Sequence, residues 1–308
     1  MSLVEVARIS LPTHPPEGGF DHAAVDPRAS RLYVAHTSND AVDVVDLEGR
    51  KFLSSIPKLT AVAGVWVAEE QRLLFTSNRG EDTASIIDLD SLRELFRVPT
   101  GARPNGMAFD PDRGILLVAG VGNAQIPNAT PSLTFVDTSH GRVIGQLRTP
   151  GRTRWAIYHA ASDSFYVNIA DPPSIAVVAA ADLHRVNRRI PIPAKGPHGL
   201  EQDPSGALLY CACDEGVLVT VALPSGRAER VGALGGAPDV LWLNRSRRHL
   251  YCAVEDPGVI QTFGLDPCRL LETVRTAPGA GTLTVDPVRS EVHSFLPGSH
   301  EDLVLQDR

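Results

Sequence analysis

One pattern recurs seven times along the chain of 308 residues and leaves little of the sequence unassigned. In each copy an alternating apolar segment ends at a polar turn, and a second apolar segment follows. The clear copies carry Asp-Pro at the turn: AVDPRASRLYVAH (24–36), AFDPDRGILLVAG (108–120), EQDPSGALLYCAC (201–213) and TVDPVRSEVHSFL (284–296). Weaker copies are WVAEEQRLLFTSN (66–78), IYHAASDSFYVNI (157–169) and WLNRSRRHLYCAV (242–254). A third and a fourth apolar segment complete each copy, which gives a period of about 42 residues, typical of four-stranded propeller blades.

The two ends of the chain complete the repeat count. The last repeat stops after its third segment, LVLQDR (303–308), whereas LVEVARISL (3–11) has no segment before it. Pairing 3–11 with the last blade would supply the missing fourth strand and remove an exposed edge. The 24 Pro and 26 Gly recur too often for long helices. We therefore predict an all-β, seven-bladed β-propeller, one domain over 1–308, closed by 3–11.

The repeats also resemble a known family. RLYVAHTSNDAVDVVDL (31–47) and RLLFTSNRGEDTASIIDL (72–89) resemble the blades of YVTN-repeat propellers, and the likeness extends over essentially the whole chain. RPNGMAFDP (103–111) resembles a segment of gluconolactonase-type propellers. The resemblance implies the propeller fold but no single function, because this scaffold hosts lactonases, lyases, binding proteins and scaffold proteins.

Composition narrows the class of partner. The formal net charge is −7 and aromatic residues make up 6% of the chain, so the sequence argues against nucleic-acid binding. The N-terminal residues MSLVEVARISLP show neither the basic leader nor the long apolar run expected of a signal peptide, and no apolar run in the sequence approaches the roughly 18 residues of a membrane helix. We expect a cytoplasmic monomer without a membrane partner. The cysteines lack C-x-x-C spacing and are interpreted as structural: Cys211, Cys213, Cys252 and Cys268.

The first strand of a propeller blade lines the central channel and begins at the face where ligands usually bind. Its first positions should therefore ring the mouth, and five of the seven are polar: Asp21, Ala63, Asn105, Arg154, His198, Asp239 and Gly281. His22 follows Asp21 at the position that is glycine in two other copies, Gly106 and Gly199. Each polar residue alone is explained by turn chemistry between repeats. Their concentration at one mouth favours a site.

The chemistry of this ring suggests a divalent metal. Asp21, Asn105, His198 and Asp239 offer oxygen and imidazole donors suited to Ca, Mn or Zn. Such an ion would polarise a carbonyl or activate water. This resembles propeller lactonases, which hold a metal on the channel axis, although their early glutamate ligand has only an approximate counterpart in Glu17.

Further residues are assigned around the ring. Arg154 would clamp a carboxylate or an oxyanion, and His22 or His36 would serve as general base. Loops after the second strands add a second set of polar residues, of which Asn78, Arg79 and Glu255, with Arg154, are the substrate-binding candidates. The other members are Ser38, Asn39, Asp171, Asp214, Glu215, Asp256, His300 and Glu301. The loop 121–132 is longer than its counterparts and is expected to cover or flank the mouth.

Two functions remain open at this point. The first is a hydrolase, lactonase-like, or a lyase, acting on a small anionic or lactone-like molecule at the channel mouth. The second is a non-catalytic propeller that binds a ligand or a partner protein on one face. The sequence contains no G-x-S-x-G elbow, H-E-x-x-H motif, Walker A loop or EF-hand loop that would fix the chemistry.

Overall fold

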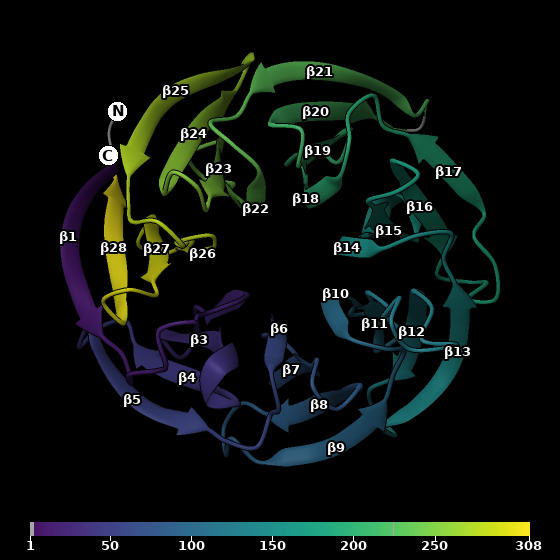
Figure 1. Cartoon of the computed structure of the whole chain (residues 1–308), viewed down its shortest axis with the longest axis horizontal. Helices are drawn as coiled ribbons and strands as arrows, with labels where there is room; N and C mark the ends of the chain where they lie inside the picture. Colours follow the sequence, from purple (N-terminus) through teal and green to yellow (C-terminus); the bar gives the residue numbers. More distant parts are fainter. Residues whose placement is uncertain (1–2, 224) are drawn as a thin grey trace.

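Seven four-stranded antiparallel sheets form a ring in the computed structural model, which describes residues 3–223 and 225–308 (Figure 1). In blades 1 to 6 the strands run outward from the channel in chain order. Blades 1 to 3 are β2 (Ala23–Asp26), β3 (Arg31–His36), β4 (Ala41–Asp46), β5 (Lys51–Ile56); β6 (Val62–Ala68), β7 (Leu73–Asn78), β8 (Thr83–Asp88), β9 (Glu94–Pro99); and β10 (Pro104–Asp110), β11 (Ile115–Gly120), β12 (Ser132–Asp137), β13 (Arg142–Arg148). The predicted seven-bladed propeller is confirmed.

The remaining blades repeat the arrangement. Blades 4 to 6 are β14 (Thr153–His159), β15 (Ser164–Ile169), β16 (Ser174–Ala179), β17 (Arg188–Pro191); β18 (Pro197–Gln202), β19 (Leu208–Cys213), β20 (Val217–Ala222), β21 (Arg227–Ala233); and β22 (Pro238–Asn244), β23 (His249–Val254), β24 (Val259–Leu265), β25 (Cys268–Arg275). Blade 7 is β26 (Leu283–Asp286), β27 (Glu291–Leu296), β28 (Glu301–Asp307) and β1 (Leu3–Ser10). The described helices are two short 3-10 turns, η1 (Thr37–Asn39) and η2 (Ala160–Ser162), and no helix in these residues is long and apolar enough to cross a membrane.

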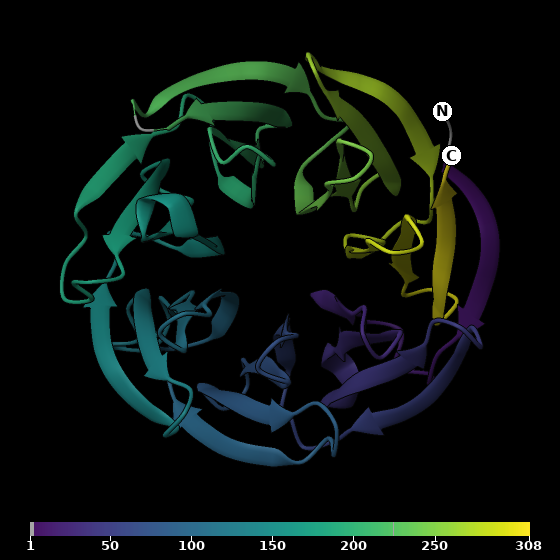
Figure 2. The same ribbon diagram turned by 180° about the vertical axis from the view of Figure 1, so that it is seen from behind.

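The N-terminal strand closes the ring. β1 pairs antiparallel with β28, from Leu3 opposite Asp307 to Ser10 opposite Glu301. Figure 2 shows β1 as the outermost strand beside the C-terminal strand, with both chain ends at this seam. The closure predicted for residues 3–11 is confirmed, with the strand ending one residue earlier, at Ser10.

The burial pattern explains why the sequence folds this way. Second and third strands such as β11 and β4 are almost wholly buried, because neighbouring blades cover both of their faces. Outer strands such as β9, with the pattern eeeeBe, face solvent. The core therefore consists of apolar layers between blades, and three of the four cysteines, Cys211, Cys213 and Cys252, lie in those layers as free thiols.

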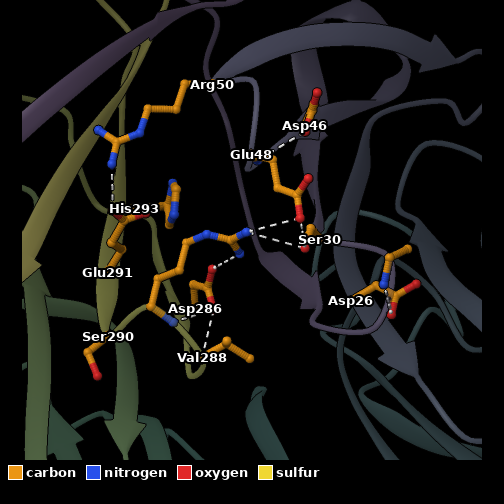
Figure 3. Close-up of polar contacts among 12 residues, drawn as sticks. Asp26, Ser30, Asp46, Glu48, Arg50, Asp286, Val288, Ser290, Glu291 and His293 are labelled. Atoms are coloured by element: carbon orange, nitrogen blue, oxygen red, sulfur yellow. Dashed lines mark hydrogen bonds and ion pairs between the residues drawn. The ribbon is translucent and has the colours of Figure 1, made fainter.

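The Asp-Pro turns define what we call the lower face. Asp286 is fully buried and accepts hydrogen bonds from the backbone N–H groups of Val288 (2.8 Å) and Arg289 (3.1 Å). Asp110 caps its turn in the same manner. Polar contacts also cross the seam between blades 7 and 1 here, where Arg50 donates to Glu291 at 2.8 Å (Figure 3). The aspartates of these repeats are thus structural caps.

Candidate ligand site at the upper mouth of the channel

The upper face carries the loops after the second and fourth strands, and the channel opens there among the predicted ring residues. In five blades the register of the first strand shifts at this level, for example between Pro104 and Met107 and between Pro197 and Leu200. Such an irregularity redirects side chains out of the regular pleat. Asn105, Arg154, His198 and Asp239 all lie in these irregular segments, as the repeat alignment predicts.

His198 is held between two carboxylates. Its Nδ1 lies 2.8 Å from Asp214 Oδ1, and its Nε2 lies 3.1 Å from Asp239 Oδ1. Burial alone would lower the pKa of His198, but the hydrogen bonds to Asp214 and Asp239 raise it above the ordinary value. Arg154 Nη1 also lies 3.1 Å from Nε2. The Nε2 atom of His198 therefore donates to Asp239 when it carries a proton and accepts from Arg154 when it does not.

Asp21 and His22 form a second group on the opposite side of the ring. Arg79 donates to Asp21 Oδ2 at 2.7 Å, and the backbone N–H of His22 donates to Asp21 Oδ1 at 3.0 Å. The His22 ring is buried against Trp155 of blade 4, with ring centroids 4.3 Å apart. Burial lowers the pKa of His22 despite the carboxylates of Asp21 and Asp239. His22 is thus a neutral imidazole at neutral pH.

Arginines gather on the part of the mouth built by blades 2, 3 and 4. Burial and the positive charges of Arg154, Arg103 and Arg79 lower the pKa of Arg152. The guanidinium groups of Arg103 and Arg152 have no carboxylate partner among the described residues. Both line a cavity of about 730 Å³ whose other wall is the loop 121–131. The prediction that this long loop flanks the mouth agrees with that position.

A second cavity, of about 590 Å³, lies beside the first ring residue. Asp21, Arg79 and Glu255 line it together with the segment 16–20. Burial and the carboxylates of Asp239 and Asp256 raise the pKa of Glu255. The candidates Arg79 and Glu255 therefore share one cavity, whereas the candidate Asn78 is fully buried and hydrogen-bonded within blade 2, to Thr83 and Ser85.

The four residues predicted to bind a metal are already engaged in different ways. Asp21 is paired with Arg79, and both ring nitrogens of His198 have carboxylate partners. Asn105 Oδ1 is buried without a hydrogen-bond partner. Among the described residues, no group of three His, Cys, Asp or Glu side chains is arranged to hold a metal ion. The metal assignment stays a prediction, and it requires His198 to leave at least one carboxylate.

His36, the other predicted general base, is fully buried inside blade 1. Its Nδ1 lies 2.6 Å from Asp43 Oδ2, and its ring packs on Phe20 and His14. These contacts lie between blades 1 and 7. The role of general base stays a prediction for His36. Of the two predicted bases, His22 is the one that contacts residues at the channel mouth.

Sequence reasoning underestimated the arginines and one glutamate. Neither Arg103 nor Arg152 was among the site residues that the sequence predicted. The sequence did contain a signal for them, because arginines occur on the upper-face loops of three successive repeats. Glu201 was also missed, although burial raises its pKa to about 7.

Comparisons with known proteins support the fold. No protein-family model matches the sequence, and no curated protein is similar to it. Among solved structures, a chain of Kuenenia stuttgartiensis hydrazine synthase is similar, with a TM-score of 0.80, 14% sequence identity and coverage of 96% of this chain and 97% of that chain. At this identity the likeness establishes the seven-bladed β-propeller fold alone.

Proposed function

We propose that this protein binds a small carboxylate-bearing molecule at the upper mouth of its channel. The observation that carries the proposal is a pair of guanidinium groups, Arg103 and Arg152, on one wall of the 730 Å³ cavity, which have no carboxylate partner within residues 3–223 and 225–308. Arg79 and Arg154 add positive charge nearby. Like charges this close repel each other, and an anion between them would remove the repulsion while accepting charge-assisted hydrogen bonds.

The cavity suits an organic anion. Its volume falls in the range of small-molecule sites, and the loop side is largely apolar, with Val121, Ile126 and Pro127. Ile126 is 56% exposed, so a ligand would cover apolar surface that now faces water. A molecule with a carboxylate toward the arginines and an apolar body toward the loop would satisfy both walls.

Hydrolysis of the ligand, lactonase-like, is the second candidate function. A neutral His22 can accept a proton at neutral pH, and Arg154 can stabilise a developing oxyanion. A metal bound by Asp21, Asn105, His198 and Asp239, whether Ca, Mn or Zn, would polarise the scissile carbonyl in this scheme, and lyase chemistry would use the same base. The arginines alone would suffice to bind an anion, whereas hydrolysis also needs a general base. We therefore place non-catalytic binding before hydrolysis.

The same proposal includes the finer assignments that the sequence suggested. The repeats would belong to the YVTN-repeat propeller family, and the protein would act as a cytoplasmic monomer on a small molecule. The propeller needs no second chain to complete its sheets, because β1 already fills the last blade.

The binding test is a calorimetric titration with a panel of small carboxylates, phosphate esters and lactones. We expect one carboxylate to bind, and Arg152→Ala and Arg103→Ala each to weaken it about tenfold or more, since a charge-assisted hydrogen bond contributes about 1.5–3 kcal/mol. Arg185→Ala removes an exposed arginine of the blade 4 turn and should leave binding unchanged. Binding that is insensitive to both cavity variants would exclude this site.

The catalytic test uses the lactones of the same panel. Turnover that disappears in His22→Gln, while carboxylate binding is retained, would establish the hydrolase. Binding without turnover of any panel member would leave the protein a ligand-binding propeller.

A further inference from the structure

Three histidines meet on the upper face at the seam between blades 7 and 1. His14 follows β1, His36 ends β3, and His300 lies in the turn between β27 and β28. The ring centroids of His14 and His36 are 5.1 Å apart, and those of His14 and His300 are 4.3 Å apart. Phe20 packs on His36 and His14 and covers one side of the group. Residues from three separate parts of the chain thus converge on His14.

Each of these histidines has a buried ring nitrogen without a hydrogen-bond partner: His14 Nε2, His36 Nε2 and His300 Nδ1. His14 is 9% exposed and His36 is 0% exposed. A buried polar atom left without a partner costs about 1–3 kcal/mol, and such atoms are few in folded proteins. Three of them on imidazoles that gather around His14 therefore point to one common partner.

The opposite nitrogens fix the tautomers of two rings. His14 Nδ1 lies 2.9 Å from the carbonyl oxygen of Pro15, which can only accept, so Nδ1 carries the proton. His36 Nδ1 faces Asp43 Oδ2 at 2.6 Å, and Ser55 donates to the other oxygen of that carboxylate at 2.6 Å. Both Nε2 atoms are consequently left with a free lone pair. A carboxylate that orients a histidine in this way is the usual outer partner of a metal ligand.

We propose that His14, His36 and His300 bind one divalent transition-metal ion, with zinc as the best fit to three imidazole ligands. The site is separate from the four channel residues considered above. The 590 Å³ cavity lies alongside, since its walls include Pro16 to Phe20 next to His14, and Pro297 and Gly298 next to His300.

The ion has to draw the rings together, because no three such side chains in the described part of the chain already form a metal shell. His300 is the residue able to move. It is half-buried in a turn, and its ring nitrogens make no hydrogen bond among the described residues, so rotating the side chain breaks none. His14 and His36 are held by Pro15 and Asp43 in the orientation that leaves Nε2 free.

The test is a zinc titration of the full chain, purified without a metal-binding tag and stripped with a chelator. We expect one equivalent to bind, to raise the Tm, and to be replaceable by cobalt with the visible spectrum of a nitrogen-ligated ion. His300→Ala and His14→Ala should each weaken zinc binding by at least about tenfold, and Asp43→Asn, which changes only the outer partner, by about tenfold. His300→Ala alters a turn, so it tests the site even if variants at the buried His36 do not fold.

Two controls decide where a bound ion lies. His184→Ala removes an exposed histidine and should leave the titration unchanged. His198→Ala distinguishes the two positions, because zinc that is retained in this variant and lost in His14→Ala belongs to the histidine group and not to the channel mouth. The proposal is overturned if no stoichiometric zinc binds, if His300→Ala and His14→Ala bind as tightly as the wild type, or if His198→Ala alone abolishes binding.

Discussion

Glu201 gives the fold a dependence on pH that can be measured. It lies on β18, beside the backbone of Leu243 in blade 6, and burial raises its pKa from the ordinary 4.5 to about 7. The folded state therefore holds this proton more tightly than the unfolded chain does. The resulting penalty is absent below about pH 4.5, grows as pH rises to about 7 and stays constant above. We expect Glu201→Gln to raise the free energy of unfolding by about 2 kcal/mol at pH 8 and to leave it unchanged at pH 4.5.

Urea unfolding at pH 4.5, 6 and 8 measures this difference. Glu70→Gln, at an exposed position of the lower-face turn of blade 2 and far from Glu201 in the ring, should shift stability equally little at all three pH values. If Glu201→Gln and the wild type showed the same change of stability with pH, the carboxyl would titrate normally in the folded state.

The positions of the ring residues could be predicted from the sequence, but their partners could not. Alternation and the repeat place Asn105, His198 and Asp239 at equivalent points of their blades, so their common level follows from strand geometry alone. The pairing of Asp21 with Arg79 depends on how far one blade is rotated against the next, which no local pattern encodes. For the same reason Asp21 looked free to bind a metal.

At the scale of the strand, glycine permits two blades to approach each other. A Cβ at Gly106 would lie under 3.0 Å from the backbone carbonyl oxygen of Arg154 in blade 4. Backbone cannot rotate away as a flexible side chain would, so one strand has to shift. We expect Gly106→Ala to lower the free energy of unfolding by about 1–3 kcal/mol, as overpacking does, and to displace Arg154 at the mouth.

The matched substitution is Gly298→Ala, because a Cβ there meets nothing within 4 Å. Denaturant unfolding of both variants, with carboxylate titration as a second readout, separates the effects. Equal stability of Gly106→Ala and Gly298→Ala would mean that the blades adjust without cost.

This contact also explains a pattern that sequence reasoning assigned to turns. The Asn-Gly and His-Gly pairs at 105–106 and 198–199 lie inside first strands, where their glycines face the next blade. The order of the strands could be predicted because apolar and polar residues alternate where one face of a strand is buried. The strand predicted over 3–11, for example, is β1 over Leu3–Ser10. The role of these glycines depends on the distance between sheets, which becomes visible only in three dimensions.

At the scale of the whole molecule, the ring is held closed by β1. This strand buries Leu3 and Ile9 and pairs along its length with β28. Side chains reinforce the seam, since Arg50 donates to the carbonyl oxygen of Val6 and Arg8 bonds to Glu301. The histidine group proposed to bind zinc lies where the chain passes from β1 into blade 1, so a bound ion would join His36 of blade 1 to His14 and His300 of blade 7.

Removing β1 should open the ring. Deletion of residues 1–10 leaves β28 as an unpaired edge with buried apolar residues exposed beside it, and exposed edges of this kind pair with other chains. We expect a lower Tm and a larger mass per particle than the full chain has, in light scattering after size exclusion. A synthetic peptide of residues 1–12 should restore both properties by strand addition, whereas a scrambled peptide of the same composition should not. If the shortened chain kept the Tm and the oligomeric state of the full chain, six complete blades and one three-stranded blade would suffice for folding, and β1 would serve the His14 site more than the fold.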